Sequence, residues 1–146
     1  MSQNDGRQTT PATLQGGCLC GAIRFRAQGR PLRVNYCHCG QCRRHSGAPV
    51  AAFATFRAAD VEWIGASPRL FRSSAEAQRG FCPDCGTSLS WQGDAGGGEA
   101  LVDLGVGCFD DASSFSPADH LWTGRALPWF HVADALPRHA RERGGD

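Results

Sequence analysis

Seven of the eight cysteines in this 146-residue chain stand in three short clusters, and this clustering constrains the fold more than any other feature. The clusters are Cys18 with Cys20, Cys37 with Cys39 and Cys42, and Cys82 with Cys85, while Cys108 stands alone. The polar N-terminal stretch, residues 1–17, lacks the apolar core of a signal peptide, which predicts a cytoplasmic protein. Thiols stay reduced in the cytoplasm, so clustered cysteines are expected to bind metal rather than to form disulfides.

The first and third clusters together have the spacing of a closed four-sulfur metal site. Residues i and i+2 of an extended chain point to the same face, so Cys18 and Cys20 present two sulfurs side by side. The segment 82–86, Cys-Pro-Asp-Cys-Gly, predicts a tight turn that brings two more thiolates together, because proline presets the backbone and glycine accepts positive φ. Four thiolates complete a tetrahedral, structural zinc site. Iron also suits such a site.

The middle cluster supplies three thiolates from six residues, namely Cys37, Cys39 and Cys42. Three protein ligands leave a tetrahedral zinc with an open fourth position, which is the arrangement of a reactive site. A histidine would change that conclusion, because His38 or His45 as fourth ligand would give an inert Cys3His centre. Spacing alone does not decide between the two arrangements.

Composition and charge limit the possible partners. The formal net charge is +1, from 15 basic and 14 acidic residues, so nothing favours nucleic acid or an anionic membrane as a partner. No apolar run approaches the roughly 20 residues of a membrane-spanning helix. The chain length fits one domain, predicted over residues 15–138, with a disordered lead-in at 1–14 and a flexible tail at 139–146.

The hydrophobic pattern predicts a mainly β fold. Apolar and polar residues alternate, as in half-buried strands, over the stretches 23–26, 61–63, 88–92 and 102–106. The apolar run 50–56 predicts a strand covered on both faces. The 19 glycines and 8 prolines interrupt the chain too often for long helices, and only a short helix at 41–45 is expected. The glycine-rich stretch 93–98 is expected to be a turn between two strands.

Four motifs carry a resemblance to a known family: GGCLCG at 16–21, YCHCGQCR at 36–43, SGA at 46–48 and FCPDCG at 81–86. They resemble the glutathione-dependent formaldehyde-activating enzyme family, also described as centromere-protein-V-like, over roughly residues 16–137. The resemblance implies a β-tent fold of small sheets packed together and stapled by zinc. It assigns a structural zinc to Cys18, Cys20, Cys82 and Cys85, and a second, more labile zinc to Cys37, Cys39 and Cys42.

The resemblance also implies an activity, the condensation of formaldehyde with glutathione to S-hydroxymethylglutathione, which is a carbon–sulfur lyase reaction in reverse. An open zinc at Cys37, Cys39 and Cys42 suits this chemistry, because zinc favours the thiolate of a bound thiol and a nucleophilic sulfur must lie beside the aldehyde. The expected partners are therefore a small thiol and a small aldehyde. The alternative is a non-catalytic zinc module or scaffold of the same fold.

Three residues outside the clusters are candidates for substrate binding. Arg43 and Arg44 follow the open site and can pair with the carboxylates of a glutathione-like substrate. The competing interpretation for both is a solvated charged face. Trp129 lies in a segment, 119–137, that resembles the C-terminal stretch of the family, and it is a candidate pocket wall.

Three further residues have both a chemical and a structural interpretation. His120 and His131 can line the mouth of a pocket, although a hydrogen-bonded structural role is expected for each. Cys108 is an extra thiol without a metal-free partner thiol. A small buried hydrophobe is therefore expected at this position rather than a redox nucleophile.

Overall fold

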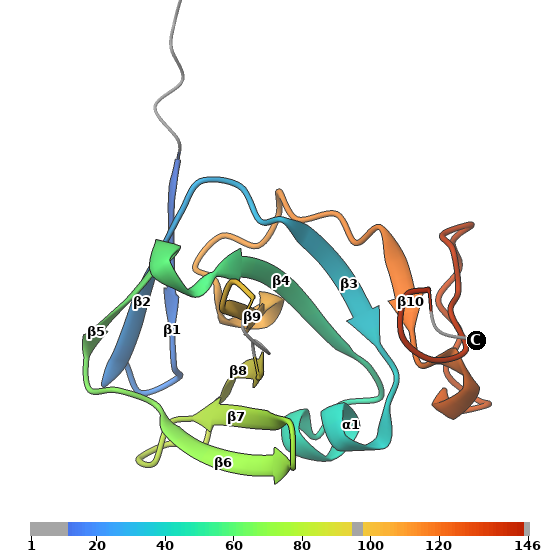
Figure 1. The fold of residues 1–146 in the computed structure, drawn as a ribbon, viewed down its shortest axis with the longest axis horizontal. Coiled ribbons are helices and arrows are strands. Elements are labelled where there is room, and N and C mark those ends of the chain that lie inside the picture. The colour runs from blue at the N-terminus through green and yellow to red at the C-terminus, as the bar shows by residue number, and fades with distance from the viewer. Residues whose placement is uncertain (1–11, 95–97, 145–146) are drawn as a thin grey trace, which may run out of the picture.

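The computed structural model describes residues 12–94 and 98–144, and in this range strands predominate (Figure 1). In chain order the strands are β1 (Thr13–Gly17), β2 (Ile23–Gln28), β3 (Arg33–Cys37), β4 (Ala51–Arg57), β5 (Val61–Gly65), β6 (Arg69–Ser74), β7 (Ala77–Phe81), β8 (Ser88–Gly93), β9 (Leu101–Gly105) and β10 (Asp119–Leu121). The helix α1 (Gly40–Ser46) covers the predicted helix at 41–45, and short 3-10 helices lie at Ala58–Asp60, Val106–Cys108 and Thr123–Arg125. The prediction of a mainly β fold with at most short helices is confirmed. Nowhere in the described ranges does a helix reach the length and hydropathy of a membrane span.

The strands form two sheets. One has three strands in the order β1-β2-β5, and the other has seven in the order β10-β3-β4-β9-β8-β7-β6. Neighbouring strands are antiparallel except β3 and β10, which run parallel. In Figure 1 the larger sheet curls, so that β3 and β4 lie across from β6 and β7, with α1 beside β7. The curl brings segments that are distant in the sequence together around α1.

The main core lies between the two sheets. It joins apolar side chains of β2 to buried residues of β3, β4 and β9 and to Phe109. Phe25 of β2 packs edge-on against Trp63 of β5 and against Phe109, with ring centroids 5.7 and 5.0 Å apart. The alternation predicted for 23–26 is confirmed, and β4 is buried at most positions, as predicted for a strand covered on both faces.

One face of β8 differs from the sequence prediction. The strand is confirmed, but Ser90, which the alternation assigned to the wet face, is only 3% exposed. It packs against Gly80 of β7, where an added Cβ would clash with the Ser90 hydroxyl oxygen. A glycine on the neighbouring strand therefore makes room for a buried polar side chain.

Two predicted segments extend beyond the described residues. The lead-in predicted at 1–14 overlaps β1, because Thr13 and Leu14 already pair with Gln28 and Ala27, and residues 1–11 lie outside the described range. The turn predicted at 93–98 falls between β8 and β9, as expected, but residues 95–97 are not described.

The described residues of the segment predicted as a flexible tail run beside β10. The backbone N–H of Trp122 donates to the carbonyl of Arg141 at 3.0 Å, and that of His139 donates to His120 at 2.9 Å. The guanidinium of Arg143 donates to both carboxylate oxygens of the buried Asp119, at 2.6 and 2.8 Å. This ion pair closes the C-terminal segment onto the sheet.

Arg143→Ala is expected to lower the free energy of unfolding at pH 7 by about 1–2 kcal/mol, a value discounted because Arg143 is partly exposed. The hydrogen bonds from Arg143 hold the pKa of Asp119 below its usual range. A depressed folded-state pKa contributes stability that is present above the unfolded pKa and lost as the pH falls through the folded pKa. The difference between wild type and variant should therefore shrink in acid.

Urea unfolding of both proteins at pH 7 and in acid tests this expectation. Arg141→Ala is the matched control, because the hydrogen bond of Arg141 to Trp122 runs through its backbone carbonyl, which the substitution keeps. A difference between wild type and Arg143→Ala that persists unchanged in acid would contradict the assignment to the Asp119 carboxylate.

Candidate metal centres and substrate cavity

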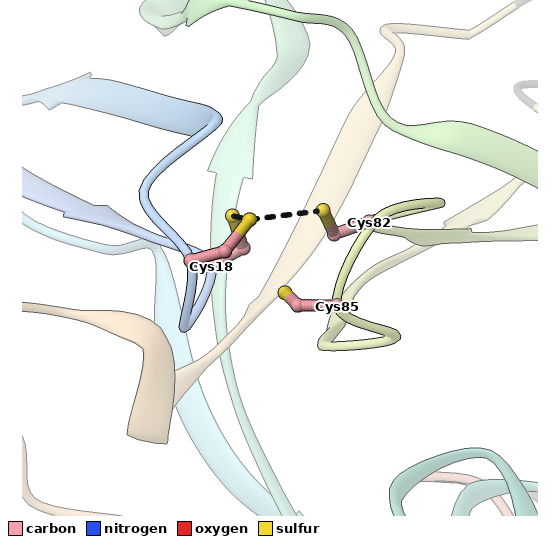
Figure 2. Close-up of side chains that lie close together, drawn as sticks. Cys18, Cys82 and Cys85 are labelled. Carbon is pink, nitrogen blue, oxygen red and sulfur yellow. Dashed lines mark hydrogen bonds between the residues drawn. The ribbon is translucent and has the colours of Figure 1, made fainter.

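The first candidate metal centre connects the two sheets (Figure 2). Its four sulfur atoms all lie within 4.8 Å of one another and belong to Cys18, Cys20, Cys82 and Cys85. The first pair follows β1 of the three-stranded sheet, and the second pair follows β7 of the seven-stranded sheet. The sulfur atoms of the labelled cysteines in Figure 2 point toward a common centre. Cys18 and Cys82 are buried, Cys85 is half-buried and Cys20 is exposed, and four thiols in this arrangement can hold a metal ion with no position left for a substrate.

Backbone and hydroxyl groups support these four thiols. The N–H of Ile23 donates to Cys18 Sγ at 3.3 Å, and Gly86 adopts the positive φ predicted for it, 79°, where the turn closes. The Thr87 hydroxyl lies 3.2 Å from Cys85 Sγ, and its hydrogen bond lowers the pKa of Cys85 to about 5. Thr87 also accepts from the N–H of Leu19 at 3.0 Å, so it ties both cysteine loops together. The sequence interpretation missed Thr87.

The second candidate metal centre lies where β3 leads into α1. The sulfur atoms of Cys37, Cys39 and Cys42 all lie within 4.8 Å of one another. Cys39 caps the helix, because its sulfur accepts the backbone N–H of Cys42 at 3.3 Å. Hydrogen bonds from Cys37 and Cys42 lower the pKa of Cys39 to about 2, and hydrogen bonding to Cys39 and Cys42 raises the pKa of Cys37. Three thiolates this close together repel one another, so joint ionisation costs free energy. A bound cation offsets that repulsion, and the group is therefore suited to hold one.

Neither candidate histidine joins this group. His38 is buried and its Nε2 lies 2.8 Å from Nδ1 of His120, which in turn contacts Asp134 through Nε2 at 2.9 Å. His45 contacts the Ser88 hydroxyl through Nδ1 at 2.5 Å. Among the described His, Cys, Asp and Glu side chains, only the three cysteines gather at this position. The geometry therefore favours three protein ligands over the Cys3His alternative.

The three cysteines face a cavity of about 910 Å³. Arg43 and Arg44 of α1 line this cavity. Both guanidinium groups approach Gly40, where an added Cβ would lie 3.8 Å from one terminal nitrogen of each arginine. The Nε of Arg43 is buried without a hydrogen-bond partner in the described structure. The walls carry further charges of both signs: Arg33, Glu76, Asp94, Asp103, Arg125, Glu142 and Arg143. Such a cavity suits a ligand with several charged groups.

The aromatic walls of this cavity are Phe53, Trp91 and Trp122. Trp129, the tryptophan predicted from the sequence, is 67% exposed and packs edge-on against Phe130 with centroids 6.2 Å apart. It is not among the residues that line this cavity. Trp122 has a φ of 57°, which is unusual for a bulky residue and is typical of strain kept at functional sites.

Arg79 is the main residue of the site that the sequence interpretation missed. It lies in β7, is 3% exposed, and lines the same cavity as the cysteines. Its Nη1 and Nη2 donate to Cys42 Sγ at 3.5 and 3.6 Å. A buried cation beside the sulfurs favours their thiolate forms. In the sequence, only its position three residues before Cys82 could have drawn attention to it.

The remaining candidates lie outside the two sulfur groups. Cys108 donates from Sγ to the carbonyl of Ser88 at 3.2 Å, and burial raises the pKa of this thiol to about 11. A protonated thiol packed against the core agrees with the expected structural role. His120 is 1% exposed and hydrogen-bonded, whereas His131 is exposed and lines a second cavity of about 300 Å³ with His38 and His120.

The protein is of a mainly β class with two cysteine clusters that can hold metal ions. One cluster lies between the two sheets, and the other faces a cavity. The family model of the glutathione-dependent formaldehyde-activating enzyme matches residues 13–125. The chain therefore belongs to this family, and the resemblance inferred from the cysteine motifs is confirmed.

Two curated relatives and one solved structure are similar to this chain. An uncharacterised lyase of Schizosaccharomyces pombe is 36% identical over 78 residues, which cover 51% of this chain and 54% of that protein. A putative glutathione-dependent formaldehyde-activating enzyme of Halomonas elongata is 31% identical over 84 residues, covering 52% and 54%. The chain thus spans about half the length of these relatives. A Rhodobacter sphaeroides protein of known crystal structure shares the fold, with a TM-score of 0.54, 24% identity, and coverage of 70% of this chain and 91% of that one.

Proposed function

We propose that this protein is a carbon–sulfur lyase-type enzyme that joins a glutathione-like thiol to formaldehyde or another small aldehyde and depends on zinc. The observation that carries the proposal is the group of Cys37, Cys39 and Cys42 facing a cavity, with no described histidine or carboxylate in the group. Membership of the family and the name of the Halomonas elongata relative support the same reaction, and the name of the Schizosaccharomyces pombe relative supports a lyase. A cytoplasmic location and the absence of nucleic-acid partners stay predictions.

The donor sets fit two zinc ions with different roles. Four soft thiolates between the sheets, from Cys18, Cys20, Cys82 and Cys85, suit a structural ion. Three thiolates beside a cavity suit a labile ion, and the buried guanidinium of Arg79 fits a site that carries net negative charge. When bound there, zinc would supply a Lewis acid that favours the thiolate form of an incoming thiol.

The residues around the cavity bind and orient the substrates in this proposal. The converging guanidinium groups of Arg43 and Arg44 pair with the carboxylates of the thiol substrate. Trp91 and Trp122 form apolar walls that exclude water from the reacting atoms. In the reaction, the thiol sulfur forms a bond to the carbonyl carbon and the C=O π electrons move to oxygen. The oxygen then takes up the proton that the thiol released.

Exchange NMR spectroscopy of formaldehyde and glutathione tests the proposal, because it measures the rate of adduct formation at equilibrium. The wild-type protein is expected to accelerate the exchange, and Cys39→Ser is expected to abolish the acceleration. Arg43→Ala combined with Arg44→Ala should raise the glutathione concentration needed for half-saturation by about tenfold or more, since charge-assisted bonds contribute about 1.5–3 kcal/mol each. The same double variant should leave the half-saturating concentration of 2-mercaptoethanol unchanged, because that thiol has no carboxylate.

Two results would decide against the proposal. No acceleration at stoichiometric protein would remove the formaldehyde–glutathione reaction. Glutathione binding without acceleration would favour the alternative, a thiol-binding module of the same fold without chemistry of its own. Arg26→Gln, an exposed substitution on β2 that changes the net charge by one unit, is the control for general electrostatic effects.

A further inference from the structure

Arg79 is a buried cation without a carboxylate partner. Its side chain is 3% exposed, and the ion pairs between described arginines and carboxylates involve other arginines. Both terminal nitrogens donate to Cys42 Sγ, and Nη2 also lies 3.5 Å from the Gln41 side-chain oxygen. The Nε atom is buried with no described partner. The guanidinium therefore depends on the sulfur group for its counter-charge.

Burial of an unpaired charge is costly, so a guanidinium in this position needs a permanent anion beside it. The three thiolates of Cys37, Cys39 and Cys42 provide that anion when they hold a divalent metal, because metal ligands are deprotonated. Three thiolates and one divalent ion carry one net negative charge. A fourth ligand that is neutral keeps this charge, whereas an anionic sulfur ligand doubles it. The positive charge of Arg79 offsets the added negative charge.

We infer that Arg79 makes the fourth ligand position of the Cys37, Cys39 and Cys42 centre selective for anionic ligands, such as thiolates, over neutral ones. The inference rests on the metal-binding role proposed for the three cysteines. It gives Arg79 a different task from Arg43 and Arg44. Those two residues recognise the carboxylates of the substrate. Arg79 instead responds to the negative charge of the substrate sulfur, and it does so through its contact with Cys42. Arg79 is thus a specificity-determining residue that acts through a ligand.

Cobalt-loaded protein allows ligand binding to be measured without turnover, since each new ligand changes the visible spectrum of cobalt. Arg79→Gln is expected to weaken 2-mercaptoethanol binding by about tenfold, the lower range for a charge-assisted bond. Binding of imidazole, a neutral ligand, should change less than about threefold, because it adds no net charge for the guanidinium to offset. Arg26→Gln should change neither affinity. Because 2-mercaptoethanol lacks a carboxylate, Arg43 and Arg44 do not enter the result.

Arg79→Lys keeps a positive charge near the sulfurs and is expected to fold and to keep thiol affinity within about threefold of wild type, because the inference depends on charge. A parallel loss of thiol and imidazole affinity in either variant would overturn the inference, because it indicates a purely structural role. So would a tenfold loss of thiol affinity in Arg79→Lys, which would assign the effect to guanidinium geometry rather than to charge. Thiol ligation without accelerated adduct formation would contradict the proposed enzyme activity and leave the selectivity of the site in place.

Discussion

Cys82→Ser is expected to abolish soluble, folded protein, whereas Cys39→Ser keeps the fold. Cys82 is 0% exposed and belongs to the sulfur group that joins the two sheets. Binding of a structural zinc contributes about 10–16 kcal/mol in zinc-finger peptides, which is as large as the whole stability of a typical domain, about 5–15 kcal/mol. Loss of one ligand from such a site leaves too little stability. Cys39 belongs to the cavity-facing group, whose removal leaves the link between the sheets intact.

Soluble yield, circular dichroism and thermal unfolding of the two variants measure this difference. Cys108→Ser is the matched control, because it replaces a half-buried thiol that lies outside both sulfur groups. It should cost about 1–3 kcal/mol at most, through desolvation of the new hydroxyl. Equal thermal collapse of Cys82→Ser and Cys39→Ser would mean that both centres are structural.

Mild chelation of the wild-type protein is expected to remove about one zinc ion per chain while the fold persists. The ion lost is the one on Cys37, Cys39 and Cys42, because a centre with three protein ligands beside a cavity is open to the chelator. The ion between the sheets should resist, since its removal requires unfolding. Mass spectrometry under native conditions counts the metal ions, and circular dichroism follows the fold. A single metal from the start, or simultaneous loss of two, would contradict this expectation.

The cysteine groups could be predicted because their ligands are local in the sequence. Two pairs and one triple of cysteines fix their own geometry within a few residues, and only the association of 18–20 with 82–85 requires the fold. Strands with one apolar face, such as β2 and β9, could be predicted for the same reason, since alternation is a local signal.

The remaining features depend on contacts that are distant in the sequence. β6 is an edge strand whose Leu70 and Phe71 are 50% and 60% exposed, so its pattern does not report burial. The sequence of β7 does not alternate between apolar and polar residues, because one of its buried positions holds Arg79. The partner of Arg79 is Cys42, 37 residues away in the sequence. Trp129 is the candidate cavity wall from the sequence, whereas Trp122 lines the cavity in the structure. Which tryptophan reaches the cavity depends on how the segment after β10 folds back, and no local sequence pattern encodes this.

Crystals of the protein with zinc, measured at the zinc absorption edge with and without glutathione, test the central claim most directly. Anomalous scattering is expected at both cysteine groups, with four cysteine sulfurs around one ion. The other ion should have Cys37, Cys39 and Cys42 and one ligand from outside the chain, which the glutathione sulfur replaces when that thiol is present. A fourth protein ligand at this ion, such as His38 or His45, or an ion that glutathione does not reach, would contradict the account.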